Sequence, residues 1–263
     1  MKFAHLIDGM MMQENSEATR ERVREANKIA IAMMRKAGFE IGEGVQVVVD
    51  PQLPFMGYTI PQGSGFRIVV SGMAVDSGML EALLVHEMSH VYRMRTHHPS
   101  HDGRIIQEVV SGLGKRGLSQ DYHQKILSGL VNDIQDLYAD DIATKVIKKG
   151  GFLRRDQLTV FLQDWVKDEP VESNDAEMDR WVNSSIMVHN ARAIGQMARH
   201  EIEDTGDKAA TSNKRYLSRI SPILSSQFEY FKGLMANLKE NITEEEYRRL
   251  LTDYLNRFLE IAG

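Results

Sequence analysis

The sequence predicts an α+β fold with an N-terminal helix, a small sheet that includes a hairpin, a helix that carries two histidines, and then a larger all-helical part. Runs of β-branched residues concentrate between residues 45 and 71, and the segments on either side have the apolar spacing of helices. Beyond Gly103 such runs are few, and no proline interrupts the chain between Pro99 and Pro170. We therefore expect two parts, residues 1–102 with the sheet and residues 103–263 with the remaining helices.

Length and composition exclude several classes of protein. The chain has 263 residues, which suits one large domain or two small ones, and its formal charge of -5 with mixed signs gives no basic surface for nucleic acid. It has no cysteine, so disulfides and thiolate metal sites are excluded, and His, Asp and Glu remain as possible zinc ligands. No segment approaches the roughly 18 apolar residues of a membrane span. We expect a soluble, cytoplasmic protein that binds neither nucleic acid nor membrane; its oligomeric state does not follow from the sequence.

The first part begins with a helix and continues with strands. Apolar side chains recur at helical spacing from Ser16 to Lys36, and Gly38 provides a stop. β-branched residues predict a strand at residues 45–49 and two further strands at Phe55 to Ile60 and Phe66 to Ser71. The segment Pro-Gln-Gly-Ser-Gly between the last two strands is typical of a hairpin turn.

A helix predicted from Met79 to Arg95 contains the pattern H-E-x-x-H. Its two histidines, His86 and His90, are four residues apart, so both imidazoles share one face of the helix and can reach one metal ion. Glu87 is turned about 100° away from His86, too far to be an equivalent ligand but beside a water on the metal. Zinc with three protein ligands lowers the pKa of such a water to about 7, so that a carboxylate can accept its proton. The alternative is a structural histidine pair that forms the pattern by chance.

The order of strands, hairpin and histidine-bearing helix resembles the N-terminal half of zincin metallopeptidases. In that family the strand just before the helix borders the cleft and pairs with an extended peptide substrate. The resemblance implies this role for Phe66 to Ser71, since the unpaired backbone groups of an edge strand can bind a peptide backbone. An ordinary internal strand is the alternative.

The resemblance extends to the residues D-L-Y-A-D at positions 136–140. Gluzincins, a branch of the zincins, take their third ligand from a downstream helix with the pattern E-x-x-A-D, in which the first acid binds zinc and the second orients a ligand histidine. By resemblance Asp136 is the third ligand and Asp140 its companion, with aspartate in place of glutamate; either carboxylate binds zinc. Independently of the family, the two acids are four residues apart on one helix face. The alternatives are an acidic face in solvent, or Glu108 as the ligand, although Glu108 lacks an acid four residues later.

Three further histidines, His97, His98 and His101, cluster where Pro99 should end the helix. They could form a second metal site. Histidines at the C-terminus of a helix more commonly face solvent and favour the negative end of its dipole. We expect the second arrangement.

Hydrolysis through a tetrahedral transition state needs a hydrogen-bond donor at the developing oxyanion. In the zincin clan this donor is commonly a Tyr, His or Arg from the C-terminal half. Between Met178 and Glu203, a polar stripe contains His189, Arg192, Gln196 and His200. The resemblance makes His189 and Arg192 candidate catalytic residues, and a stripe that merely faces solvent is the alternative.

The rest of the chain shows helices without a chemical motif. Amphipathic patterns predict helices from Leu158 to Val166 and from Tyr216 to Leu238. Thr243 and Glu246 form a capping box that should begin the last helix.

We therefore expect a zinc-dependent metallopeptidase that binds one zinc ion per chain and hydrolyses peptide or protein substrates. Glu87 would be the general base and then the proton donor to the leaving amine. A protein of the zincin fold that uses the metal as a structural or binding scaffold, without proteolytic activity, is the second hypothesis. Glu87 favours the enzyme, because a structural site has no use for a carboxylate beside an open coordination position.

Overall fold

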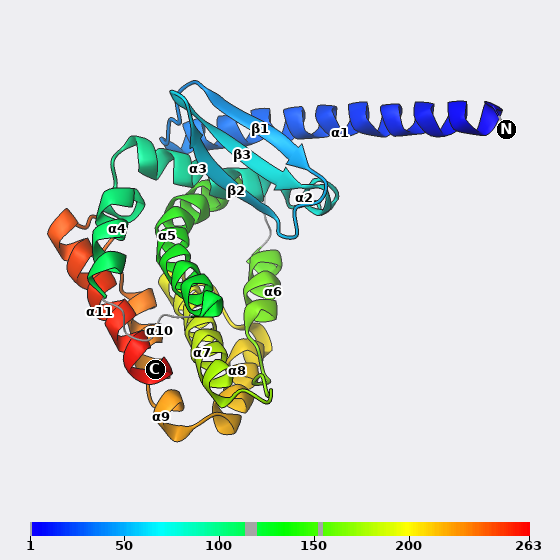
Figure 1. The fold of residues 1–263 in the computed structure, drawn as a ribbon. Coiled ribbons are helices and arrows are strands. Elements are labelled where there is room, and N and C mark those ends of the chain that lie inside the picture. The colour runs from blue at the N-terminus through cyan, green and yellow to red at the C-terminus, as the bar shows by residue number, and fades with distance from the viewer. Residues whose placement is uncertain (1, 114–119, 152–154) are drawn as a thin grey trace. The chain divides into compact units, whose positions relative to one another are not determined.

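A computed structural model describes residues 2–113, 120–151 and 155–263, without the side chains of residues 2–16, 155 and 156. It confirms the predicted α+β class (Figure 1). The strands are β1 (Val45–Asp50), β2 (Gly57–Gln62) and β3 (Gly65–Ser71). The helices are α1 (Lys2–Ala37), α2 (Gly72–Asp76), α3 (Leu80–Arg95), α4 (Gly103–Gly112), α5 (Asp121–Gly150), α6 (Arg155–Trp165), α7 (Ala176–Arg199), α8 (Lys208–Arg219), α9 (Pro222–Ser225), α10 (Phe228–Ala236) and α11 (Glu244–Ala262), with 3-10 turns η1 (Pro99–His101) and η2 (Thr205–Asp207). Within these described ranges no helix has the length and apolar content that a membrane crossing needs.

The chain divides into two compact units. The first unit comprises residues 1–96 and 142–152, and the second comprises residues 97–141 and 153–263. This division differs from the expected one after residue 102, because one continuous helix, α5, supplies residues to both units.

The sheet of the first unit has the strand order β1-β3-β2, with β1 parallel and β2 antiparallel to β3. The β2–β3 hairpin turns at Gly63, whose φ of 57° lies in the left-handed region. β3 is therefore the central strand and pairs along both edges. The prediction of an edge strand at Phe66 to Ser71 is wrong, because β1 pairs with the edge of β3 that the hairpin leaves open. β1 and β2 are the outer strands among the described residues, and α3 contacts β2.

Helices α1 and α3 pack against each other and against the sheet. The buried stripe of α1 includes Ala26, Ala30 and Met34, which are spaced four residues apart on one helix face. Arg22 of α1 also forms an ion pair with Glu81 in the first turn of α3, with one N–O distance of 3.0 Å. Helix α3, which carries the two candidate ligand histidines, is thus fixed on two sides within the first unit.

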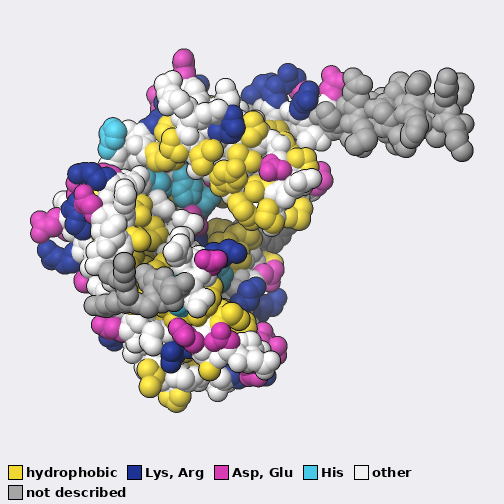
Figure 2. Space-filling view, viewed as in Figure 1, with side chains coloured by type: hydrophobic (Ala, Val, Ile, Leu, Met, Phe, Trp, Pro, Cys, Tyr) yellow, Lys and Arg dark blue, Asp and Glu magenta, His cyan; other side chains and the backbone are white. Residues whose placement is uncertain are grey.

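The two faces of the sheet differ in exposure, because successive residues of a strand point to opposite sides. Burial alternates along β1, and Val48 is 37% exposed while Ile60 of β2 is 40% exposed. Phe55 is 51% exposed and its ring lies 5.9 Å from that of Tyr58. Figure 2 shows hydrophobic side chains gathered over this part of the first unit.

The core of the second unit includes close packing of α7 on α10. Gly195 permits it, because a Cβ at this position would lie 2.9 Å from the carbonyl oxygen of Lys232. At the start of α11 the predicted capping box is confirmed: Thr243 Oγ1 accepts from the Glu246 N–H, and the Glu246 carboxylate accepts from the Thr243 N–H. Large aromatic side chains fill this core, namely Tyr138, Tyr216, Phe231, Tyr247, Tyr254 and Phe258.

The helix expected from Tyr216 to Leu238 is broken into three. α8 ends at Arg219, and α9 and α10 follow as separate helices. Pro222 is the physical reason, since proline disfavours a helical conformation at the residue before it and is itself favoured at the first helical position. Ser221 accordingly has φ -55° and ψ 139°, and Pro222 begins α9.

Candidate metal centre

Helix α3 carries the two candidate ligand histidines. Its apolar stripe of Leu80, Leu84 and Met88 is completely buried at four-residue spacing, so this side of the helix belongs to the core of the first unit. His86 and His90 lie outside the stripe and are half-buried. The packing of α3 therefore fixes the helix and presents both imidazoles on another side.

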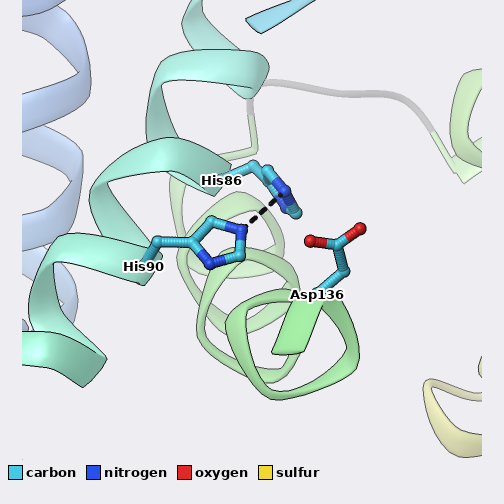
Figure 3. A group of neighbouring side chains, drawn as sticks. All are labelled: His86, His90 and Asp136. Carbon is cyan, nitrogen blue, oxygen red and sulfur yellow. Dashed lines mark hydrogen bonds between the residues drawn. The ribbon is translucent and has the colours of Figure 1, made fainter. Parts of the chain in front are cut away.

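The two imidazoles converge (Figure 3). Nε2 of His86 lies 3.1 Å from Nε2 of His90, and the ring planes meet at 82°. Two nitrogens that each lie 2.0–2.1 Å from a tetrahedral zinc ion are about 3.3–3.4 Å apart. The observed separation is close to this value, and it is also the length of a direct hydrogen bond between the two rings, so the pair is compatible with one shared zinc ion.

Asp136 on α5 is the third member of this group (Figure 3). One carboxylate oxygen of Asp136 and one nitrogen of each histidine all lie within 4.8 Å of one another. Two imidazoles and a carboxylate are a donor set that zinc takes in hydrolases. α5 enters the first unit at Ile142. Asp136 lies six residues before this point, which is about 9 Å of continuous helix.

Side chains of α7 hold the carboxylates of α5 within the second unit. The buried guanidinium of Arg192 donates from Nη2 to Oδ2 of Asp136 at 3.1 Å and from Nη1 to Oδ1 of Asp133 at 2.5 Å. Gln196, one turn later, donates through Nε2 to Oδ2 of Asp140 at 2.8 Å. The bond from Arg192 orients the carboxylate of Asp136, the candidate third ligand. The predicted role of Asp140 beside a ligand histidine stays a prediction.

Burial and charge shift the pKa values of this network. Burial raises the pKa of Asp133, and the positive charge of Arg192 opposes the shift. Burial alone would lower the pKa of Arg192, but the nearby carboxylates of α5 raise it above its ordinary value. Arg192 therefore remains a cation among three acids.

The two candidate oxyanion donors, His189 and Arg192, both lie against Trp165 of α6. The guanidinium carbon of Arg192 is 5.0 Å from the centre of the Trp165 ring, and the half-buried ring of His189 stacks on it at 5.6 Å. Burial lowers the pKa of His189, which favours the neutral imidazole. The bonds of Arg192 to two carboxylates favour a role in holding Asp136 over a role as an oxyanion donor.

Glu87 points from α3 toward strand β2. Only 4% of Glu87 is exposed, and its Oε2 accepts a hydrogen bond of 2.7 Å from Oγ1 of Thr59. The candidate general base therefore has a defined orientation within the first unit.

The alternative third ligand, Glu108 of α4, forms an ion pair with Arg248 of α11. Nη2 of Arg248 lies 2.9 Å from Oε2 of Glu108. In the part of the chain that the structure describes, the histidine group contains Asp136 and does not contain Glu108. The geometry thus favours Asp136.

The histidines that follow α3 are built into the second unit. Nδ1 of His98 and Nδ1 of His101 each lie 2.8 Å from the hydroxyl of the buried Ser100, and Nε2 of His98 lies 3.0 Å from the carbonyl oxygen of Glu240. His97 is exposed. The prediction that the cluster faces solvent is therefore wrong for His98 and His101, because the η1 turn brings both rings onto Ser100.

Comparison with known proteins places the chain in a family. Residues 36–260 match the model of a family described as a family of unknown function (DUF5781). The chain belongs to this family. The DUF5781 match includes α3 and α5, the two helices that carry the candidate ligands. No match was found among the curated proteins or the solved structures.

Two contributors to the centre were not singled out from the sequence. Asp133 lies three residues before Asp136, and the acid spacing 133, 136 and 140 on one helix face is a signal that could have found it. Thr59 gave no such signal, because its partner depends on which face of β2 meets α3. That face follows only from the strand register.

Proposed function

We propose that this chain is a zinc-dependent metallopeptidase, with His86, His90 and Asp136 as zinc ligands. The observation that carries the proposal is the 3.1 Å separation of the two histidine Nε2 atoms, which suits two ligands of one tetrahedral zinc ion. Three protein ligands would leave a fourth position open, as in catalytic zinc sites. The acid that follows the first histidine supports hydrolysis, since a purely structural site does not need it.

The residues of the chain would supply the proton transfers. A zinc ion with three protein ligands contributes a Lewis acid and lowers the pKa of a coordinated water to about 7. Glu87 accepts a proton from the attacking water and then gives it to the nitrogen of the leaving amine. Glu87 is a carboxylate again when the C–N bond has broken.

Strand β2 is our candidate for backbone pairing with a peptide substrate. It is an outer strand and it contacts α3, so it takes the role first inferred for Phe66 to Ser71. Pro61 has no N–H to donate, so pairing through N–H groups would be limited to the residues before it. An extended peptide would therefore run beside Gly57 to Ile60.

A metal-binding scaffold without proteolytic activity is the second candidate function. Its support is the environment of Glu87, which is buried and bonded to Thr59. A structural site could hold a carboxylate in the same way. An activity measurement separates the two candidates.

Glu87→Gln is the variant that tests the proposal, because glutamine keeps the size of the side chain and cannot accept the proton. Zinc content and thermal stability should stay near those of the wild type. Hydrolysis of a peptide library, followed by mass spectrometry, should fall at least about 100-fold. Glu43→Gln changes an exposed carboxylate of the first unit and should leave hydrolysis unchanged.

Two outcomes would count against the enzyme. Equal cleavage by the wild type and Glu87→Gln would contradict the mechanism. Zinc-loaded wild type that cleaves no member of a broad library would favour the scaffold.

A further inference from the structure

A hydrogen bond between Thr59 and Glu87 links strand β2 to helix α3 within the first unit. Oγ1 of Thr59 lies 2.7 Å from Oε2 of Glu87 and 3.2 Å from the carbonyl oxygen of the same residue. A hydroxyl has a single hydrogen, and the shorter contact to a charged acceptor is the stronger bond. The carboxylate oxygen Oε2 is therefore the acceptor.

The sheet fixes the position of this donor. Thr59 pairs with Ile68 of the central strand β3, and paired residues share a face of the sheet. Ile68 is completely buried, so the hydroxyl of Thr59 lies on an apolar face, where a hydroxyl without a partner is costly. The bond to Glu87 satisfies it, and β-branching leaves Thr59 few alternative rotamers.

Gly57 lies two residues earlier on the same face of β2 and leaves space beside the other oxygen of Glu87. A Cβ at Gly57 would lie 3.6 Å from Oε1 of Glu87 and 2.9 Å from the carbonyl oxygen of Val69. β2 therefore brings a donor to Oε2 and no side chain to Oε1. The two oxygens of the Glu87 carboxylate therefore have different surroundings on β2.

We propose that Thr59 is a positioning residue that determines which oxygen of Glu87 takes the proton. The inference rests on the proposed function, because it needs Glu87 to be the general base. Thr59 holds Oε2, and Oε1 accepts the proton of the attacking water while the water oxygen bonds to the carbonyl carbon. Oε1 then gives this proton to the amine nitrogen as the C–N bond breaks, and Thr59 keeps its own proton throughout.

Two substitutions of Thr59 test the role. Thr59→Val removes the hydroxyl but keeps the size and β-branching, and Thr59→Ser keeps the hydroxyl. In the zinc-loaded full chain, Thr59→Val should lower kcat about 10-fold or more with KM within about twofold, as expected for loss of a bond to a charged group. Thr59→Ser should keep kcat within about threefold of the wild type. Thr211→Val makes the same substitution at an exposed threonine of α8, which has no part in the proposed site, and should leave kcat unchanged.

A double variant separates positioning from general damage. In a Glu87→Gln background, Thr59→Val should cause no further loss of hydrolysis, because Thr59 acts through Glu87. Thermal unfolding of the wild type, Thr59→Val, Glu87→Ala and their double variant gives a readout that does not depend on activity; alanine at position 87 cannot accept the hydrogen bond, whereas glutamine can. Non-additive changes in stability would show that the bond forms in solution.

The outcomes distinguish the inference from the proposed function. Full kcat in Thr59→Val, or a loss that Thr59→Ser shares, would overturn the positioning role while Glu87 remains the base. Zinc-loaded wild type without hydrolysis would overturn the proposed function, and the positioning role with it, even if the unfolding measurements show coupling. A fall in kcat limited to Thr59→Val, together with coupling, supports the inference.

Discussion

Asp136 has a shorter reach than the glutamate that gluzincins place at the third ligand position. Its side chain is one methylene shorter, so as a zinc ligand it would need its backbone closer to the metal than a glutamate does. Its orientation is also restricted, because Arg192 donates to Oδ2 at 3.1 Å. The Asp136 carboxylate is thus restricted in both reach and orientation. This leaves little freedom for another side chain to take its place in the proposed zinc site.

Asp136→Asn should therefore weaken zinc binding more than Glu108→Gln does. Asparagine keeps the size of the side chain and removes the negative charge that would bind the cation in the proposed site, whereas Glu108 is paired with Arg248. Competition with a chelator should show a loss of at least about 10-fold for Asp136→Asn and less than about twofold for Glu108→Gln. Equal affinities, or the reverse order, would assign the ligand elsewhere.

The histidine pair was predictable from the sequence because its geometry is local. Four residues of α-helix bring two side chains to one face in any surroundings, so His86 and His90 needed no tertiary information. Thr59 needed such information, because its contact with Glu87 depends on the pairing of β2 with β3. The sequence grouped Asp136 with the histidines only through its resemblance to the gluzincin pattern, since nearly fifty residues separate the two helical segments.

At the scale of elements, the pairing of α5 with α7 depends on buried charge. Arg192 is 4% exposed, and its bond to Asp133 at 2.5 Å joins the two helices within the second unit. A buried charge without its partner is strongly destabilising. Arg192 therefore contributes to the stability of the second unit as well as to the orientation of Asp136.

Arg192→Met should lower the free energy of unfolding by about 3 kcal/mol, the lower end of the range for a broken buried ion pair, because the carboxylate of Asp133 that it leaves without this cation is half-buried. Urea unfolding of the full chain measures the change. Arg248→Met is the matched control, since it breaks an exposed ion pair between α4 and α11 that should contribute only about 0–1 kcal/mol. A loss for Arg192→Met no larger than for Arg248→Met would show that the buried network does not stabilise the unit.

The elements themselves were predicted unevenly. The capping box of Thr243 and Glu246 is a signal within four residues, and it marked the start of α11 correctly. The central position of β3 had no local signal, because both of its partners are chosen by long-range pairing. The break at Pro222 did have one, the proline itself, although the apolar spacing of a helix continues on both sides of it.

At the scale of the whole molecule, α5 belongs to both compact units and carries Asp136 near the point where it passes from one to the other. The match to the DUF5781 family extends from residue 36 to residue 260 and so covers most of both units. The sequence predicted the α+β class and the order of its parts. It did not predict a helix shared by two units, because a division into units depends on packing.

The zinc content of the purified protein tests the central claim most directly. His90→Ala removes one of the two nitrogens that lie 3.1 Å apart. His97→Asn is the matched control, because His97 is exposed and asparagine tolerates its left-handed φ of 51°. A zinc centre on α3 predicts about one zinc ion per chain in the wild type and in His97→Asn, and loss of zinc in His90→Ala. Undiminished zinc in His90→Ala would contradict it.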